Sequence, residues 1–188
     1  MKKIYLTLIF LLALTVNMAA QEKRPLQWFI SGGPSSVIAL NGSSNTSLGG
    51  KISAGTWLNG YTGFRANVEV ANIWMKNDFT AMSYGASIDW MINLLAMDTY
   101  HWTKGFFLNT FVGVGYNYYS LDKKYSDKYS KINTVDFNFS LQAIYKLNPK
   151  LSLFFEPGIK IGPKFYDIEN KKDPYVSLML TAGVTFNL

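Results

Sequence analysis

Apolar and polar residues alternate one by one along most of the chain after residue 21. In the stretch 64–70, for example, apolar residues occupy every even position and polar or charged residues every odd one. Side chains on a β-strand point to opposite faces in turn, so a period of two predicts strands with one apolar and one polar face. Eight segments follow this pattern: 27–38, 49–58, 62–74, 81–95, 105–119, 133–147, 150–162 and 174–188.

The length of these segments indicates where they lie. Several are longer than 12 residues, whereas strands of soluble proteins have about five or six residues. A tilted strand that crosses a bilayer needs about 9–11 residues. After residue 21 no apolar run is long enough for a spanning helix, and only helices and closed barrels satisfy every backbone group in lipid. We therefore predict an all-β fold, an eight-stranded antiparallel up-and-down transmembrane β-barrel.

The connections between the segments differ in length. Tight turns are predicted at 59–61 and at Asn148-Pro149, and longer polar connections at 41–47, 121–131 and 163–173. Short turns on the periplasmic side and longer loops on the outer side are typical of bacterial outer-membrane barrels. An even number of strands puts both termini on the periplasmic side. The connection 94–104 departs from this rule, because it is long and yet expected to be periplasmic.

Aromatic residues fall near the predicted strand ends, where hydrocarbon meets water. Those near periplasmic ends are Trp28, Trp57, Trp90, Trp102, Tyr145 and Phe186, and those near outer ends are Trp74, Tyr116, Tyr118 and Tyr175. Aromatics that fill the core of a soluble sandwich would not need this placement.

The first residues predict export. Lys2 and Lys3 precede an apolar run over 4–16, and small residues end at Ala20. This is the pattern of a secretory signal peptide. We expect residues 1–20 to be removed and residues 21–188 to form a barrel in the bacterial outer membrane.

Composition excludes several classes of site. The 188 residues include no cysteine, so disulfides, thiolate metal sites and a cysteine nucleophile are absent. Without Lys2 and Lys3, 16 of the 18 basic residues remain against 12 acidic ones. This mild excess suits anionic lipid headgroups. The loop 121–131 carries four lysines against two aspartates, with two tyrosines interleaved. It could hold lipopolysaccharide or an external partner, or could simply be a solvated loop. Export argues against a nucleic-acid partner.

Several short motifs, in this order and spacing, resemble the small OmpA- and OmpX-like barrels of the outer-membrane β-barrel domain family. They are Gly55-Thr56-Trp57, Gly63-Phe64-Arg65, Ile88-Asp89-Trp90 with Asn93-Leu94, Phe111-Val112-Gly113-Val114-Gly115-Tyr116, Phe155-Glu156-Pro157 and the apolar final strand. The resemblance covers about residues 28–188. It implies insertion by the barrel assembly machinery, for which many such barrels carry a terminal aromatic residue. Here Leu188 is last and Phe186 lies two residues earlier on the same face. We expect a monomer.

The polar face carries charges that simple hairpin registers place opposite one another. These registers pair Lys51 with Glu69, Arg65 with Asp89, and Asp136 with Lys160. An eight-stranded barrel is just wide enough for its own side chains, and an unpaired charge there would be costly. We predict a structural lumen charge network of Lys51, Arg65, Glu69, Asp89, Asp136, Glu156 and Lys160.

A non-enzymatic envelope or surface role through the outer loops is the first functional prediction. A narrow gated channel with a charged lumen is the alternative. An enzyme that acts on lipids would need a base near the outer rim, but the one histidine, His101, is expected at the periplasmic end, away from Ser83, Ser87 and Asp89. A soluble lipocalin-like carrier would reverse the two faces. No catalytic residue, metal site or cofactor site is predicted.

Overall fold

The computed structural model describes residues 26–40, 46–75, 79–95, 105–121, 131–162 and 175–188. The expected signal peptide, His101, Trp102 and residues 122–130 of the lysine-rich loop lie outside these ranges. The described part forms eight strands: β1 Gln27–Ala39, β2 Thr46–Trp57, β3 Thr62–Met75, β4 Phe79–Asn93, β5 Phe106–Leu121, β6 Lys131–Lys146, β7 Leu151–Gly162 and β8 Tyr175–Asn187. Among these residues, no helix is long and apolar enough to cross a membrane.

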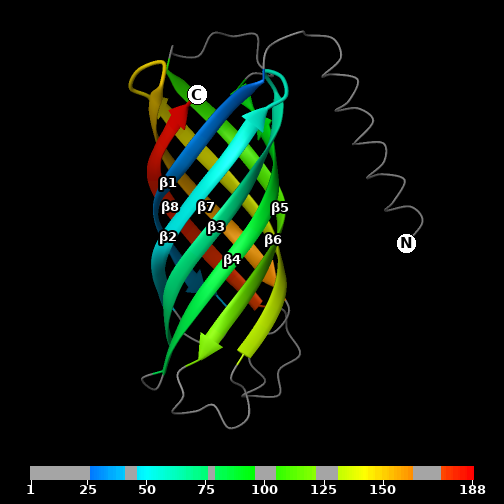
Figure 1. Ribbon diagram of the computed structural model, residues 1–188, viewed down its shortest axis with the longest axis vertical. Helices are drawn as coiled ribbons and strands as arrows, with labels where there is room; N and C mark the ends of the chain where they lie inside the picture. Colours follow the sequence, from blue (N-terminus) through cyan, green and yellow to red (C-terminus); the bar gives the residue numbers. More distant parts are fainter. Residues whose placement is uncertain (1–25, 41–45, 76–78, 96–104, 122–130, 163–174) are drawn as a thin grey trace, which may run out of the picture.

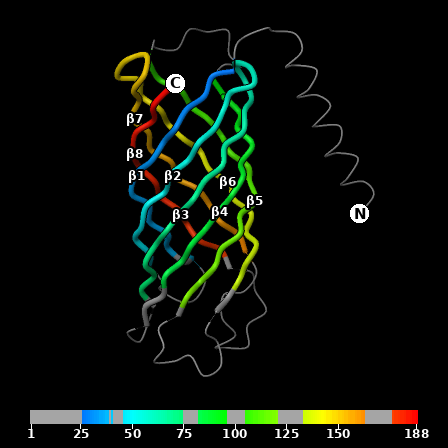
Figure 2. Tube along the Cα trace, in the orientation of Figure 1, coloured from blue at the N-terminus to red at the C-terminus, as the bar shows by residue number. Residues whose placement is uncertain are grey.

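The strands close into one antiparallel barrel in sequence order, and β1 pairs with β8. The tilted strands wind around a common axis, as Figures 1 and 2 show. The predicted fold class is thus confirmed. Strand limits agree closely with the sequence pattern, and the largest difference is at β2, which begins at Thr46 rather than at residue 49.

Two tight turns lie at one end of the barrel, which we call the turn end; the opposite end is the loop end (Figure 1). The side-chain Oδ1 of Asn59 accepts hydrogen bonds from the backbone N–H of Tyr61 (2.8 Å) and Thr62 (2.7 Å). Asn148 Oδ1 does the same for Lys150 and Leu151, both at 2.9 Å. An asparagine side chain that bonds the backbone two residues on closes a turn locally. The same device therefore fixes both predicted turns.

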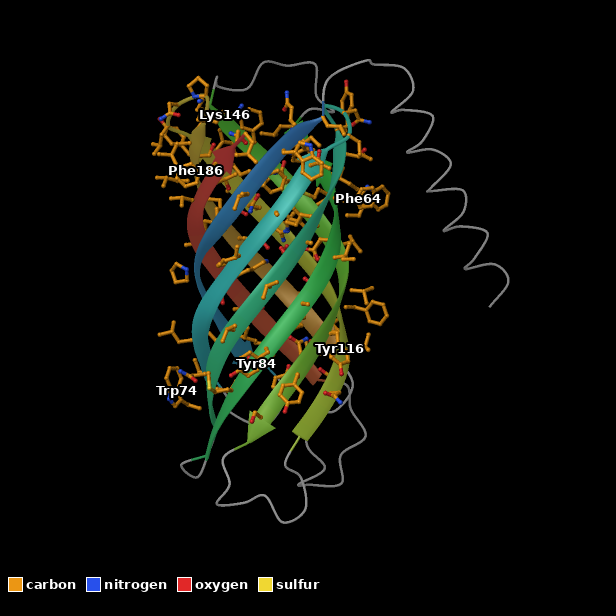
Figure 3. All side chains as sticks on the ribbon, in the orientation of Figure 1. Phe64, Trp74, Tyr84, Tyr116, Lys146 and Phe186 are labelled. Atoms are coloured by element: carbon orange, nitrogen blue, oxygen red, sulfur yellow. The ribbon has the colours of Figure 1, made fainter. Side chains whose placement is uncertain are left out.

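The barrel is polar inside and apolar outside, the reverse of a soluble protein. In β7, for example, Phe155 and Ile159 are exposed while Ser152 and Glu156 are buried. Exposed apolar side chains cover the outer surface (Figure 3). Such a surface suits lipid. The period of two does not by itself distinguish inside from outside, but the charges on the polar face had favoured this orientation.

The aromatic residues form two groups on this surface. Figure 3 places Phe64 and Phe186 toward the turn end and Trp74, Tyr84 and Tyr116 toward the loop end. Trp57 differs from the sequence expectation, because it is partly buried and packs against Phe29, Met91 and Phe111 inside the barrel. Its odd position in β2 shares the inward parity of Lys51 and Ser53.

Candidate functional site

The middle of the lumen is filled by four charged side chains, which we call the central ion cluster: Lys51, Arg65, Asp89 and Glu156. All four are at most 5% exposed. Glu156, on β7, accepts hydrogen bonds from Lys51 Nζ at 2.8 Å and from the two terminal nitrogens of Arg65 at 2.7 Å each. Arg65 lies on β3, on the opposite side of the eight-stranded ring. The bridge between them therefore crosses the lumen.

The carboxylate of Asp89, on β4, holds the other edge of Arg65. Its Oδ2 accepts hydrogen bonds from Arg65 Nε (3.0 Å) and Nη2 (2.8 Å) and from Asn67 Nδ2 (2.8 Å). Asn67 also donates to Ser87 and accepts from Ser53. Charge-assisted hydrogen bonds of this kind are the strong ones. The guanidinium is thus fixed between two carboxylates.

A second, looser group lies nearer the loop end. Lys160 Nζ is 3.4 Å from Glu69 Oε2, and Ser35 Oγ is 3.5 Å from Glu69 Oε1. Asn117 donates a hydrogen bond to Asp136. The long contacts at Glu69, whose side chain is 13% exposed, show that this end of the lumen is less tightly packed than the central ion cluster.

The structure brings the seven sequence-selected residues into one lumen, with two changes in their pairing. Lys51 lies opposite Glu69 and Arg65 opposite Asp89 in the strand register. The Lys51 ammonium, however, binds Glu156. The pairing of Asp136 with Lys160 is wrong by two residues, because Lys160 lies opposite Asn138.

The cause of this register error is the turn after β6. The sequence argument centred that turn on Asn148-Pro149. In the structure Leu147 N donates to Leu151 O at 2.9 Å, which leaves the three residues 148–150 in the loop. The pairing of Asp136 with Lys160 requires a turn centred on Asn148, whereas the observed turn is centred on Pro149. Moving the centre by one residue moves the partner along β7 by two positions and preserves the inward face.

Neutral partners of the cluster were missed by the sequence argument. Ser140 Oγ (3.1 Å) and Gln142 Nε2 (2.9 Å), both on β6, donate to Glu156. With Lys51 and Arg65 they give this carboxylate five hydrogen bonds. Their inward parity was visible in the alternation, and an inward glutamine beside an inward acid was the available signal.

Gly113 gives the cluster its room. A Cβ atom built on Gly113 would lie 2.0 Å from Asp89 Oδ1 and 2.6 Å from the backbone oxygen of Ile88. The carboxylate therefore packs directly against the β5 backbone. Glycine at this position therefore allows a close strand contact in a narrow lumen.

Toward the turn end, the polar filling gives way to apolar side chains. Phe29, Met91 and Phe111 pack together with Trp57, and the guanidinium carbon of Arg65 lies 3.7 Å from the ring centre of Phe111. Beyond them lies a cavity of about 630 Å³, which we call the turn-end cavity. The lumen is thus closed in its middle and hollow at one end.

This arrangement offers charge pairing but no evident reaction chemistry. Within the described ranges, no group of three or more histidine, cysteine, aspartate or glutamate side chains could hold a metal ion. Each carboxylate oxygen of Glu156 is occupied by basic or neutral donors. A general base needs a free lone pair within reach of a substrate proton, so Glu156 is arranged as a structural anion.

Solved structures with the same architecture are outer-membrane and surface proteins. Neisserial surface protein A matches with a TM-score of 0.63 and 14% identity, over 86% of this chain and 96% of that one. A major outer membrane protein from Thermus thermophilus matches with 0.59 and 13%, over 88% and 100%. OprG, an outer membrane protein from Pseudomonas aeruginosa, matches with 0.53 and 9%, over 86% and 95%.

This chain has the fold of the small outer-membrane barrels. No protein-family model matches the sequence, and no curated protein matches it either. At such low identity the likeness concerns the fold alone, so the role of the barrel has to be argued from its own lumen and surface.

Proposed function

We propose that the protein is a closed, non-enzymatic integral barrel of the outer membrane that supports envelope integrity or surface interaction through its outer loops. The observation that carries this proposal is the Arg65–Glu156 bridge across the lumen, at 2.7 Å between two side chains that are at most 2% exposed. A lumen blocked at its middle is unsuited to diffusion of solutes. This directs the proposed role to the outer surface and the loops.

Export and partners complete the proposal. We infer that residues 1–20 are cleaved, that the barrel assembly machinery inserts the chain as a monomer, and that lipid and lipopolysaccharide surround it. The exposed apolar side chains of the outer face support a lipid partner.

Closure is tested by conductance in planar bilayers. The unmodified protein should be silent. The double variant Arg65→Ala, Glu156→Ala removes both sides of the bridge without leaving either charge alone, so discrete conductance steps should appear. The matched control is Phe64→Ala with Phe155→Ala, which alters the outward-facing neighbours of the same two residues. Conductance of the unmodified protein that responds to voltage and changes in the bridge variant would instead identify a gated channel.

The surface role is tested in cells. Deletion of the gene should increase sensitivity to detergents and to large antibiotics if the barrel supports the envelope, and plasmid-borne protein should restore resistance. A variant in which a Gly/Ser linker replaces 122–130 should keep the heat-dependent gel shift of a folded barrel. Loss of complementation by this variant would assign the role to the loop; full complementation, with unchanged surface binding, would contradict a loop function.

A further inference from the structure

We propose that the β7–β8 hairpin opens from the rest of the barrel as one unit, and that Glu156 holds it closed. The evidence lies in its two borders, the backbone ladders of β8 with β1 and of β7 with β6. Among the described residues these ladders have nine and eight paired positions, whereas the other six ladders have 12 to 15. Within the hairpin, β7 and β8 pair without a gap from Leu151 to Gly162. The inference goes beyond the proposed function, because it concerns an opening in the barrel wall and not the outer loops.

A proline interrupts the border between β1 and β8. Pairing of these strands stops after Gly32 and resumes at Ser35, and Pro34 lies in the gap. Leu40 N donates to Val176 O at 2.9 Å, so the even-numbered residues of β1 exchange backbone hydrogen bonds with β8. Because proline has no N–H, position 34 cannot donate to β8.

The border between β6 and β7 is interrupted in the same way. Pairing stops after Ser140 and resumes at Ala143, and Pro157 of β7 lies at this gap. Leu147 N donates to Leu151 O at 2.9 Å, so the odd-numbered residues of β7 exchange backbone hydrogen bonds with β6. Position 157 therefore also lacks its bond. The two prolines weaken the two edges of one hairpin and leave its own ladder whole.

Glu156 reinforces both borders from inside the lumen. Lys51 lies opposite Gly33 of β1, and Glu156 lies opposite Thr181 of β8. The Lys51–Glu156 ion pair, at 2.8 Å, therefore connects β2 with β7, the strands next to β1 and β8. At the other border Gln142 has the register position of Glu156, within the gap, and donates to its carboxylate at 2.9 Å. Side-chain bonds to one carboxylate thus cross both interruptions.

Glycines beside Pro34 leave the β1–β8 border with few side-chain contacts. A Cβ atom on Gly33 would lie 2.0 Å from the backbone oxygen of Ala182, and one on Gly183 would lie 2.1 Å from that of Gly32. The two backbones therefore lie directly against each other at this point. Glycine in a strand has no side chain to pack across the ladder, so separation of the strands here loses little apolar contact.

The test is backbone hydrogen exchange, measured by NMR on the barrel folded in detergent micelles at several urea concentrations. By the same alternation, the amide of Leu180 faces β1 and that of Phe155 faces β6, so they report on the two borders. The amide of Tyr116 faces β4 and reports on a ladder without a gap. We expect Leu180 and Phe155 to exchange with the same urea dependence, about tenfold faster than Tyr116 or more, as local opening allows.

Variants separate the role of Glu156 from a general loss of stability. Glu156→Gln should accelerate exchange at Leu180 and Phe155 by about tenfold or more, the effect of lost hydrogen bonds to a charged group. Gln142→Leu removes a bond at one border only, and should accelerate exchange at both amides because the hairpin opens as a unit. The matched control is Asp89→Asn, which changes a buried acid of the same cluster on a strand that does not border the hairpin. It should not favour the two borders over the β4–β5 ladder.

Two further variants test the proposal even if Glu156→Gln does not fold. Pro34→Ala and Pro157→Ala supply the missing amides, and each should slow exchange at its border by about two- to tenfold, as one added hydrogen bond does. Exchange at both borders as slow as in the β4–β5 ladder would overturn the proposal. Acceleration by Gln142→Leu that is confined to the β6–β7 border would overturn opening as a unit, and equal acceleration by Asp89→Asn would overturn the role of Glu156.

Discussion

The central ion cluster and the turn-end cavity occupy neighbouring levels of the same barrel and differ in how they fill it. At the level of Glu156, long side chains from opposite strands meet at the centre and bind one another. At the level of Phe107, aromatic side chains line the wall and leave about 630 Å³ open. The number of strands in the closed ring fixes the width of the lumen. The side chains at each level then decide whether the lumen is blocked there. Ion pairs close it because their attraction draws them across the axis.

Removal of the central anion should have the largest effect. Glu156→Gln keeps the volume but leaves Arg65 and Lys51 with fewer anionic partners, so we expect a loss of about 3–5 kcal/mol in the free energy of unfolding. Urea unfolding in micelles, followed by tryptophan fluorescence and by the gel shift, measures it. Glu69→Gln, in the looser group, should cost less, because its contacts with Lys160 and Ser35 are long, at 3.4 and 3.5 Å. Equal losses for the two variants would contradict the distinction between these groups.

The second largest loss of stability is expected at the apolar layer between the central ion cluster and the turn-end cavity. Met91 is 0% exposed, and Met91→Ala should cost about 2–5 kcal/mol through lost contacts and an enlarged cavity. Met82→Ala, on the outer face at 41% exposure, is the matched control and should cost clearly less. A comparable shift of the urea midpoint in both variants would show that the boundary is not packed as a core.

Close packing of the cluster can be tested through two glycines of one strand. Gly113→Ala would drive a methyl group into Asp89 and should cost about 1–3 kcal/mol, as overpacking does. A Cβ on Gly115 meets its nearest atom at 3.2 Å, so Gly115→Ala should be tolerated better. The urea midpoints of the two variants are the measurement, and a reversed order would contradict the packing around Asp89.

The smallest expected effect concerns rescue by charge exchange. Lys51→Glu should destabilise the barrel, and the strand register alone would suggest that Glu69→Lys restores it. Because Lys51 binds Glu156 while Glu69 lies near Lys160, we expect the second change to recover only a small part of the lost stability. Full recovery in a double-mutant cycle would show that the strand register governs the pairing.

The sequence was sufficient for the strands and their faces, because alternation has a strict period and lipid tolerates few exceptions. It also located Lys51 opposite Glu69 and Arg65 opposite Asp89, because the pairs that flank these two connections, such as Met75 with Phe79, are the ones that the simple registers assume. The partner of Asp136 was missed, because the turn is centred one residue further along the chain than assumed, which shifts the register by two residues while the faces stay the same.

Contacts across the lumen could not be predicted in the same way. Hairpin register relates neighbouring strands, whereas Glu156 on β7 binds residues of β2 and β3. The length and direction of lysine and arginine side chains decide which acid they reach, and alternation carries no such information. The turn-end cavity was missed for a different reason, since Trp57 was assigned to the interface with lipid although its position in β2 turns it inward.

The distance along the chain between the partners of Glu156 bears on the order of assembly. Arg65 and Lys51 are 91 and 105 positions away from it. Neither contact can form while the barrel is an open sheet, because each joins strands that do not pair with one another. Until β1 pairs with β8, the charged groups that Glu156 binds cannot reach it and stay hydrated. Closure of the ring then removes water from all of them in one step. We therefore expect the contacts of Glu156 to form together with the β1–β8 pairing, since loop closure must precede such non-local contacts.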